Sequence, residues 1–348
     1  MTENRRNKIA ITGGGGYIGS IMIESFLSKG YEVKCIDRFY FGLQSIRKFL
    51  DDENFHFIRK DIRYVKTEDF RGIDSVIDLA GISNDPACDL DEDLTDKINR
   101  QGTVNVATSA KAAGVNRYAM ASSCSIYGAS DGKPLCESSE LKPVSLYAKS
   151  KIASEREIRT LSSNDFCVTF LRLSTVFGLS HRMRFDLIIN IMTMYAFTKG
   201  KIMILGGGKQ WRPLIHVKDV ARAFGKVIES NTDLVNGEAF NIGSNEQNYQ
   251  VEQVAKTIKR VLPINVDLEM VPDDNDKRNY NVKFNKIKEI MGYETKYDIE
   301  YGIREIYESL VSGEIDPSDA KTVTVKYYKY LIDSEKILDE IKIDGQLF

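Results

Sequence analysis

Near the start of the chain stands Lys8-Ile-Ala-Ile-Thr-Gly-Gly-Gly-Gly-Tyr-Ile-Gly19. The run from Lys8 to Thr12 is apolar and short, which is typical of a buried strand. Four glycines follow, and from Tyr17 to Lys29 apolar residues recur at helical spacing. The segment therefore predicts a strand, a tight glycine turn and a helix, which is the first unit of a nucleotide-binding sheet.

The glycines of this turn match two spacings found in dinucleotide-binding proteins. Gly14, Gly16 and Gly19 fit G-x-G-x-x-G, and Gly13, Gly16 and Gly19 fit the related G-x-x-G-x-x-G. Such spacing lets backbone amides approach a pyrophosphate at the positive end of a helix. Asp37 ends the next predicted strand, where a carboxylate accepts hydrogen bonds from the adenosine ribose and repels a 2′-phosphate. We therefore predict NAD as the cofactor, in preference to NADP.

Arg38, directly after that carboxylate, makes the cofactor preference less sharp. A guanidinium at this position would hold a 2′-phosphate, stack on the adenine or face solvent. The sequence does not choose among these three roles, so Arg38 stays a candidate cofactor-binding residue.

Strand and helix patterns alternate along the chain as far as Gly178. Further strands are predicted over 31–36, 55–58, 75–79, 117–121 and 166–171, and further helices over 94–113 and 146–161. This alternation predicts a Rossmann-type α/β fold, a doubly wound parallel sheet with helices on both faces. Beyond Gly178 the pattern is irregular, so we expect an NAD-binding domain over 1–178, which also receives about 214–243. Residues 179–348 would mainly form a smaller C-terminal α/β lobe that binds substrate, followed by a tail.

Tyr147 and Lys151 are four residues apart and on one face of the predicted helix over 146–161. A tyrosine normally titrates near about 10, so it becomes a base near neutral pH only with cationic help. Tyr195 also has a lysine four residues on, Lys199, and spacing alone cannot separate the two pairs. Position favours Tyr147, because its helix follows the fifth strand of the nucleotide-binding pattern.

Hydroxyl groups gather at the end of that fifth strand, in Ser122-Ser-Cys-Ser125. Parallel strands present their carboxyl ends to the ligand crevice, so these hydroxyls are placed to bond a reacting sugar oxygen. Cys124 would be a candidate nucleophile, but no histidine lies near it in the sequence and buried thiols are mostly inert. We therefore favour a substrate contact over nucleophilic catalysis for Cys124.

Composition excludes several other classes of protein. Lys and Arg number 48 against 50 Asp and Glu, a formal net charge of −2, which argues against nucleic-acid or anionic-membrane partners. The five cysteines are widely spaced without a C-x-x-C pair, which argues against a metal site and favours a reducing compartment. Residues 1–8 are polar and show no signal peptide or spanning helix. We expect a cytoplasmic enzyme without a metal.

Taken together, the motifs resemble the extended short-chain dehydrogenase/reductase family, and within it the nucleotide-sugar epimerases and dehydratases. The resemblance runs in order over roughly 8–312 and rests on four motifs: Thr12-Gly-Gly-Gly-Gly-Tyr-Ile-Gly19, the serines after the fifth strand, Tyr147-x-x-x-Lys151 and Gly207-Gly-Lys-Gln-Trp-Arg-Pro-Leu-Ile-His-Val217.

The resemblance implies roles for individual residues. Ser123, Tyr147 and Lys151 would be the catalytic set, acting on a hexose linked to a nucleoside diphosphate. The implied cofactor contacts include Tyr17, Ile18, Asp61, Ile62, Leu79, Ala80, Gly81, Asn99 and Ser122. The implied substrate contacts are Ser123, Cys124, Ser125, Thr175, Arg212 and Arg278, the arginines being suited to phosphate. The family further implies a homodimer in which the helices over 94–113 and 146–161 form a four-helix bundle.

Departures from the family pattern favour one reaction. Nucleotide-sugar 4,6-dehydratases carry Asp-Glu directly after the catalytic threonine, where this chain has Cys124 and Ser125. Thr175 stands where the family commonly has an asparagine that contacts the substrate. We expect an epimerase that acts at C4 of the sugar through a transient 4-keto intermediate. The alternatives are a 4-dehydrogenase or 4-ketoreductase, then a dehydratase, and last a protein that only senses NAD(P).

Overall fold

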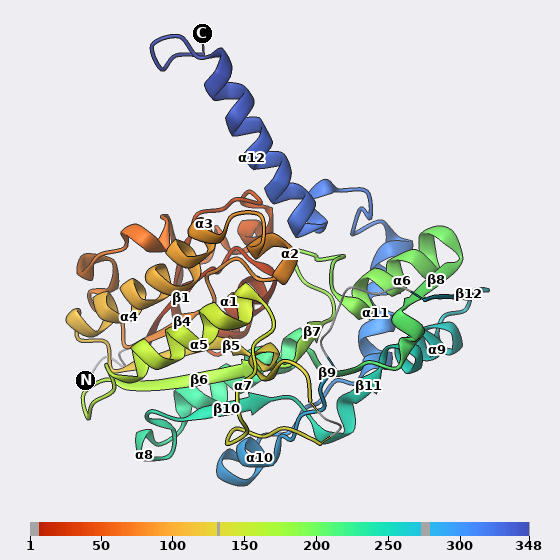
Figure 1. The fold of residues 1–348 in the computed structure, drawn as a ribbon. Helices are drawn as coiled ribbons and strands as arrows, with labels where there is room; N and C mark the ends of the chain where they lie inside the picture. Colours follow the sequence, from red (N-terminus) through yellow and green to blue (C-terminus); the bar gives the residue numbers. More distant parts are fainter. Residues whose placement is uncertain (1–6, 131–132, 273–278, 348) are drawn as a thin grey trace.

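The central element is a parallel sheet of seven strands in the order β10-β6-β5-β4-β1-β2-β3 (Figure 1). The computed structural model describes residues 7–130, 133–272 and 279–347. The strands are β1 (Lys8–Thr12), β2 (Glu32–Asp37), β3 (Phe55–Arg59), β4 (Ser75–Asp78), β5 (Arg117–Ser123), β6 (Cys167–Leu173) and β10 (Ala239–Ile242). Every pair in this sheet is parallel. The predicted Rossmann-type α/β class is confirmed.

Both faces of the sheet are covered, because its strands are apolar on both sides. In β1, Ile9 and Ile11 belong to one buried core cluster and Ala10 belongs to another, as expected when successive side chains point to opposite faces. Helices α1 (Tyr17–Ser28) and α7 (Val217–Glu229) pack together over the first cluster. Helices α4 (Thr103–Ala112) and α5 (Leu146–Arg159) pack together over the second.

The single helix predicted over 94–113 is wrong in its middle. The chain instead forms α3 (Glu92–Asp96), the π-helical turn η4 (Lys97–Gly102) and then α4. Close packing accompanies the π turn, since a Cβ on Gly102 would lie 2.8 Å from the Ile62 side chain. Such turns insert one residue into a helix, and they occur often at functional sites.

A second lobe is built on two small sheets. One contains β7 (Thr175–Phe177), β9 (Trp211–His216) and β11 (Asn248–Gln250), and the other pairs β8 (Lys201–Leu205) with β12 (Asp267–Val271). Three helices pack with one another here: α6 (Ile188–Lys199), α9 (Val251–Val261) and α11 (Ile299–Ser312). Strand β10 returns to pair with β6. The division into domains at Gly178 stays a prediction.

The other short elements connect these parts of the fold. They are η1 (Gln44–Phe49), η2 (Ile62–Tyr64), η3 (Thr67–Phe70), α2 (Asp85–Cys88), η5 (Cys124–Tyr127), η6 (Gly206–Gly208), α8 (Thr232–Val235), η7 (Asn245–Gln247), α10 (Asn285–Met291) and η8 (Ala320–Thr322).

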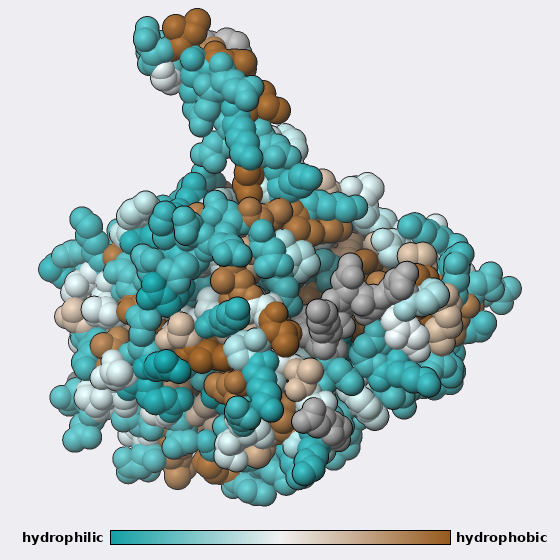
Figure 2. All heavy atoms as spheres, in the orientation of Figure 1, coloured by the Kyte–Doolittle hydropathy of each residue, from teal (hydrophilic) through white to brown (hydrophobic). Residues whose placement is uncertain are grey.

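The last helix, α12 (Thr324–Ile341), leaves the body of the molecule (Figure 1). Its first turn lies against α2, and Thr324 is buried. Further on, the helix projects outward, and Figure 2 shows brown, apolar spheres among the teal ones along it. The exposed large side chains of this helix are Tyr330, Ile337, Leu338 and Ile341. Within the described ranges, no helix, α12 included, has the length and apolarity needed to cross a membrane.

Candidate active site

A cavity of about 610 Å³ opens at the carboxyl ends of the central strands, between the sheet and the second lobe. Strand order reverses at β1, since β2 and β3 lie on one side of it and β4 onward on the other. Ligands of doubly wound sheets bind at such a point. The following predicted site residues line the cavity: Gly13, Gly16, Tyr17, Ile18, Gly19, Asp37, Arg38, Asp61, Ile62, Leu79, Ala80, Gly81, Ser122, Ser123, Ser125, Tyr147, Lys151, Thr175 and Arg212.

The glycine turn leaves space for a diphosphate. Gly13 has φ +69°, and a Cβ there would lie 2.8 Å from the Ala80 backbone. Helix α1 begins after Gly16, which provides no side chain to cap the first amides, and Tyr17 and Ile18 lie on the cavity wall. An open helix N-terminus without side chains in the way is a ready site for a pyrophosphate. The turn therefore fits a dinucleotide.

Asp37 connects this turn to the end of β2. Its Oδ2 accepts a hydrogen bond from the Gly15 amide at 3.0 Å, and its Oδ1 accepts one from the Phe39 amide at 2.5 Å. Burial raises the pKa of Asp37, and these amide hydrogen bonds act in the opposite direction. The carboxylate is thus fixed beside the glycine turn and on the cavity wall, as a ribose-binding residue has to be.

Arg38 and Asp61 bind one another. Arg38 Nη1 lies 2.8 Å from Asp61 Oδ2, and Arg63 makes a two-pronged contact with the same carboxylate at 2.7 and 3.0 Å. Burial acts to raise the pKa of Asp61, but the hydrogen bonds from Arg63 and Arg38 outweigh it and lower the pKa to about 2. The Arg38 guanidinium also lies 4.7 Å from the centre of the Tyr40 ring. Arg38 is therefore engaged with a carboxylate of the protein itself.

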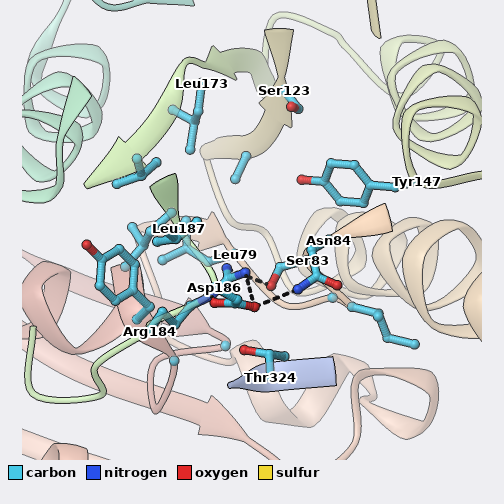
Figure 3. Close-up of a pocket in the computed structure, with 18 of the residues that line it drawn as sticks. Leu79, Ser83, Asn84, Ser123, Tyr147, Leu173, Arg184, Asp186, Leu187 and Thr324 are labelled. Atoms are coloured by element: carbon cyan, nitrogen blue, oxygen red, sulfur yellow. Dashed lines mark hydrogen bonds and ion pairs between the residues drawn. The ribbon is translucent and has the colours of Figure 1, made fainter. Parts of the chain in front are cut away.

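The three predicted catalytic residues meet at one end of the cavity. Tyr147 lies in the first turn of α5, where Ser145 caps the helix by accepting a hydrogen bond from the Ala148 amide at 3.2 Å. Figure 3 shows the Tyr147 hydroxyl pointing into the cavity below Ser123 (Figure 3). Lys151 lies one turn further along the same face and also reaches the cavity.

The expected lowering of the Tyr147 pKa by Lys151 is absent from the structure. Burial raises the pKa of Tyr147, and the nearby Cys88 and Asp85 raise it further. The Lys151 ammonium donates to the Ala121 carbonyl at 2.8 Å and lies 5.7 Å from the centre of the Tyr147 ring, and burial lowers its pKa. Both groups are held in place, but the tyrosine needs additional positive charge nearby before it ionises readily.

Three residues of the predicted site need separate comment. Asn99, expected beside the cofactor, instead accepts a hydrogen bond from the Ile82 amide at 2.7 Å and donates to the Ile82 carbonyl at 2.9 Å. Cys124, expected beside the substrate, is buried and donates to the Arg172 carbonyl at 3.1 Å, and burial raises its pKa. Neither side chain lines the cavity. Arg278 lies outside the described residues.

An ion pair inside the cavity was not predicted. Arg184 Nε donates to Asp186 Oδ1 at 2.8 Å, and Asn84 Nδ2 donates to Asp186 Oδ2 at 2.7 Å (Figure 3). Arg184 Nη1 also donates to the Ser83 hydroxyl at 3.0 Å. Burial acts to raise the pKa of Asp186, but the charge of Arg184 outweighs it, so the pKa is lowered.

The sequence did contain a signal for this ion pair. Charged residues stand at every second position in Arg182-Met-Arg-Phe-Asp186, shortly after the buried strand β7. All three charged side chains line the cavity, whereas Met183 and Phe185 between them are buried in the core. Alternating charges next to apolar residues in this place therefore indicate a polar wall.

The fold is a Rossmann-type α/β fold, and its cavity brings Ser123, Tyr147 and Lys151 together. Residues 9–243 match the NAD dependent epimerase/dehydratase family, which is more than half of the chain, and the chain belongs to this family. The predicted family and its dependence on NAD are confirmed.

Relatives within the family carry out different reactions. The human dTDP-D-glucose 4,6-dehydratase is 28% identical over 318 residues, which cover 86% of this chain and 89% of that protein. UDP-glucuronic acid decarboxylase 1 of Xenopus tropicalis is 24% identical over 316 residues, which cover 87% of this chain and 72% of that protein.

Solved structures agree with the fold. A UDP-N-acetylglucosamine 4-epimerase from Methanobrevibacter ruminantium, in complex with UDP-N-acetylmuramic acid, has a TM-score of 0.80 at 22% identity, covering 89% of this chain and 99% of that one. DesIV, a dTDP-glucose 4,6-dehydratase from Streptomyces venezuelae with NAD and TYD bound, has a TM-score of 0.78 at 24% identity, with 89% and 99% covered.

Proposed function

We propose that this protein is an NAD-dependent nucleotide-sugar epimerase that acts at C4 of the hexose through a transient 4-keto intermediate. One observation supports this choice above the others. Ser123 and Tyr147 face the cavity together, while the two positions after Ser123 hold a buried thiol, Cys124, and a hydroxyl, Ser125. The site thus offers groups for moving the C4 hydroxyl proton, without carboxylates at those two positions.

Each residue has a task in this reaction. As a phenolate, Tyr147 takes the proton of the C4 hydroxyl, which Ser123 orients by a hydrogen bond, and the additional positive charge that this ionisation needs would come from bound oxidised NAD. Bound NAD would supply the hydride chemistry, accepting hydride from C4 and returning it to the opposite face of the ketone. Lys151 would hold the cofactor ribose, and its ammonium lies 5.7 Å from the centre of the Tyr147 ring. After the ketone has turned over, Tyr147 returns its proton to the C4 oxygen, so no external oxidant is consumed.

The same family includes dehydratases, but the charges in the cavity do not favour the elimination of water. Elimination of water from the sugar needs an acid that protonates the departing hydroxyl. Asp186 has a lowered pKa beside Arg184 and is therefore ionised. Asp85 accepts a hydrogen bond from the Ser145 hydroxyl at 2.7 Å at the start of α5. Ser125 has only a hydroxyl. These surroundings favour return of the hydride to C4.

The nucleotide part of the substrate would bind along the second lobe. Arg212 lies in β9, is 6% exposed and lines the cavity, and its Nη1 donates to the Trp211 carbonyl at 2.8 Å. Arginine binds phosphate through parallel N–H groups, so we propose Arg212 as a ligand of the diphosphate. Thr175, at the start of β7, lies on the same wall and would contact the sugar.

The decisive experiment identifies a substrate and then follows hydrogen. A thermal-shift screen of UDP-, GDP-, CDP- and dTDP-hexoses finds the ligand, because a tight ligand raises apparent stability. The reaction is then run in deuterium oxide and the product is weighed. We expect an isomer of the substrate with no carbon-bound deuterium, because the hydride that leaves C4 returns to C4.

Other products would contradict the proposal, each in its own way. Loss of water with deuterium at C5 would show a dehydratase, and loss of carbon dioxide from a uronic-acid substrate would show a decarboxylase. A product two hydrogens lighter, with NADH left on the protein, would show a 4-dehydrogenase. Tight NAD binding without turnover of any nucleotide sugar would support a sensor of NAD(P).

A further inference from the structure

The C-terminal segment over residues 319–328, which we call the strap, forms one wall of the active-site cavity. Thr324, Val325 and Tyr328 line the cavity, and Val325 and Tyr328 pack against the core cluster beneath α4 and α5. In Figure 3, Thr324 lies on the far side of the Arg184–Asp186 pair from Tyr147 (Figure 3). The strap is therefore remote from the reacting groups but shares their cavity.

Aromatic contacts hold the strap at the Asp37 end of the cavity. The Tyr328 ring centre lies 5.4 Å from that of Phe41 and 5.7 Å from that of Tyr40. The Tyr327 ring also packs on Phe41, at 5.4 Å. Tyr40 and Phe41 come shortly after Asp37, so the strap covers the part of the cavity in which the adenosine half of a dinucleotide would lie.

A buried arginine attaches the strap to the cavity. Arg182 is 7% exposed, and its Nη2 donates to the Thr324 hydroxyl at 3.0 Å and to the Lys321 carbonyl at 3.3 Å. Its guanidinium lies 3.6 Å from the centre of the Phe41 ring. The same side chain lines the cavity.

Arg182 makes no ion pair at contact distance in the described part of the protein, and the carboxylates of Asp186 and Asp319 act on its charge only from farther away. Its Nε is buried without a hydrogen-bond partner, and no described carboxylate forms an ion pair with it, whereas the neighbouring Arg184 has Asp186. Burial and the charge of Arg184 lower the pKa of Arg182 to about 10. A buried cation without an anion at contact distance is unfavourable. A guanidinium with an open N–H is suited to phosphate.

We propose that Arg182 binds a phosphate of the dinucleotide cofactor and that Tyr328 covers its adenosine half, so that the strap must lift before the cofactor can exchange. The proposal rests on the function proposed above, because it concerns the same cavity. The proposed cofactor site then consists of the glycine turn, Asp37, Arg182 and Tyr328, and the strap closes it. Both the dinucleotide cofactor and the nucleotide-sugar substrate contain a diphosphate, so either molecule could present a phosphate to Arg182.

The test measures cofactor binding directly rather than activity. Protein freed of bound nucleotide is mixed with NADH, and association and release are followed by fluorescence. Tyr328→Ala and Arg182→Gln should each weaken binding by about 10- to 100-fold, mainly through faster release. Tyr330→Ala is the matched control, because Tyr330 lies on the same helix, is 64% exposed and does not line the cavity. It should bind as the unsubstituted protein does.

Two further measurements address the source of the phosphate and the integrity of the fold. ADP-ribose and UDP are titrated against Arg182→Gln. Weaker ADP-ribose with unchanged UDP supports the proposal, and weaker UDP with unchanged ADP-ribose overturns it. Tyr328→Phe keeps the ring, so it should retain most of the affinity if Tyr328→Ala acts by loss of cover. Hydrogen exchange in residues 319–341 should slow when NAD is added.

The experiment distinguishes failure of the strap proposal from failure of the proposed epimerase function. If the unsubstituted protein binds NADH and both variants bind it equally well, the strap is only structural and the proposed function stands. If the unsubstituted protein binds no dinucleotide, the proposed function and the strap proposal both fall.

Discussion

At the scale of single residues, Tyr147 and Tyr195 each have a lysine four positions on and both line the cavity, but they lie on different helices, α5 and α6. Lys199 Nζ lies 4.0 Å from the centre of the Tyr195 ring, whereas Tyr147 stands below Ser123 beside the end of β5. Tyr147→Phe should lower kcat by roughly 10²- to 10⁴-fold, because only the proton-transferring oxygen is lost. NAD binding and the unfolding midpoint should be unchanged.

The control for this prediction is Tyr195→Phe, which should leave kcat nearly as it was. Both variants are measured with the substrate found in the ligand screen. Equal losses of activity from the two changes would mean that Tyr147 is not the proton-transferring residue.

A second prediction concerns the choice between NAD and NADP. Asp37 repels a 2′-phosphate, and Arg38 is neutralised by Asp61, so the protein should bind NAD more tightly than NADP. Asp61→Asn removes the carboxylate charge that pairs with Arg38, and the same change removes the ion pair of Arg63. The ratio of the NADP to the NAD dissociation constant should fall, because Arg38 becomes available to bind the 2′-phosphate of NADP.

The measurement is the dissociation constants of NAD and NADP for the unsubstituted protein and for each variant. Arg38→Gln combined with Asp61→Asn serves as the control and should restore the wide preference. Tighter binding of NADP by the unsubstituted protein would refute the assignment of Asp37.

The same residues show what a sequence can and cannot predict about a site. The glycine turn, Asp37 and Tyr147 line the cavity, because backbone geometry ties their positions to the ends of strands and helices; their roles stay predictions. Asn99 lies in the π turn η4 and bonds the Ile82 backbone, so its side chain does not line the cavity, which the sequence pattern did not indicate. Cys124 likewise does not line the cavity, because it lies in η5 and its thiol donates to the Arg172 carbonyl.

At the scale of elements, a buried network joins α5 to the sheet. Glu155 in α5 accepts two hydrogen bonds from Arg172 in β6, at 2.8 and 3.1 Å, and one from the Ser122 hydroxyl at 2.5 Å. Glu155→Ala should lower the free energy of unfolding by about 3–5 kcal/mol, because it leaves Arg172 buried without an anion. Urea unfolding measures the change.

Glu157 provides the matched control for this network. It lies on the same helix and pairs with Arg100 at 3.0 Å, but both side chains are partly exposed, Glu157 at 42% and Arg100 at 31%. Glu157→Ala should therefore cost no more than about 1 kcal/mol. Equal losses for the two variants would show that the buried network does not anchor α5.

Strands and helices were predictable to unequal degrees. The strands of the central sheet are apolar and punctuated by glycines, so their positions agree closely with prediction, as for β1 and β2. Strand β9 was not predicted, since its Trp-Arg-Pro run looks like a loop. Helix α9 was not predicted either, although Val251, Val254 and Ile258 follow a helical period and are buried.

At the scale of the whole molecule, the cavity depends on contacts between distant parts of the chain. The glycine turn, the loop before α6 and the strap meet there, although Gly13 and Tyr328 are more than 300 residues apart in sequence. A local pattern shows that residues 326–338 are rich in tyrosine and charge. It does not show that Tyr328 docks on Phe41, because that contact depends on where the chain returns.

The last prediction is the assembly of the molecule. We expect a homodimer in which α4 and α5 of each copy form a four-helix bundle, with about 800 Å² buried on each partner. Exposed positions on these helices include Thr108 and Lys149. Light scattering after gel filtration should give twice the chain mass of 39.4 kDa. Thr108→Arg should yield a monomer, because a long charged side chain cannot fit between packed helices.

The comparison variant for that experiment lies on α12. No large hydrophobic side chain is exposed on the described residues of α4 or α5, whereas Ile337 and Ile341 of α12 are 59% and 58% exposed. Ile337→Asp should leave the dimer intact if the bundle is the interface. If it dissociates the dimer and Thr108→Arg does not, the bundle is wrong and the copies pair through the projecting helix. In that case partner contacts would also restrain the strap, and cofactor release should become faster at protein concentrations that favour the monomer.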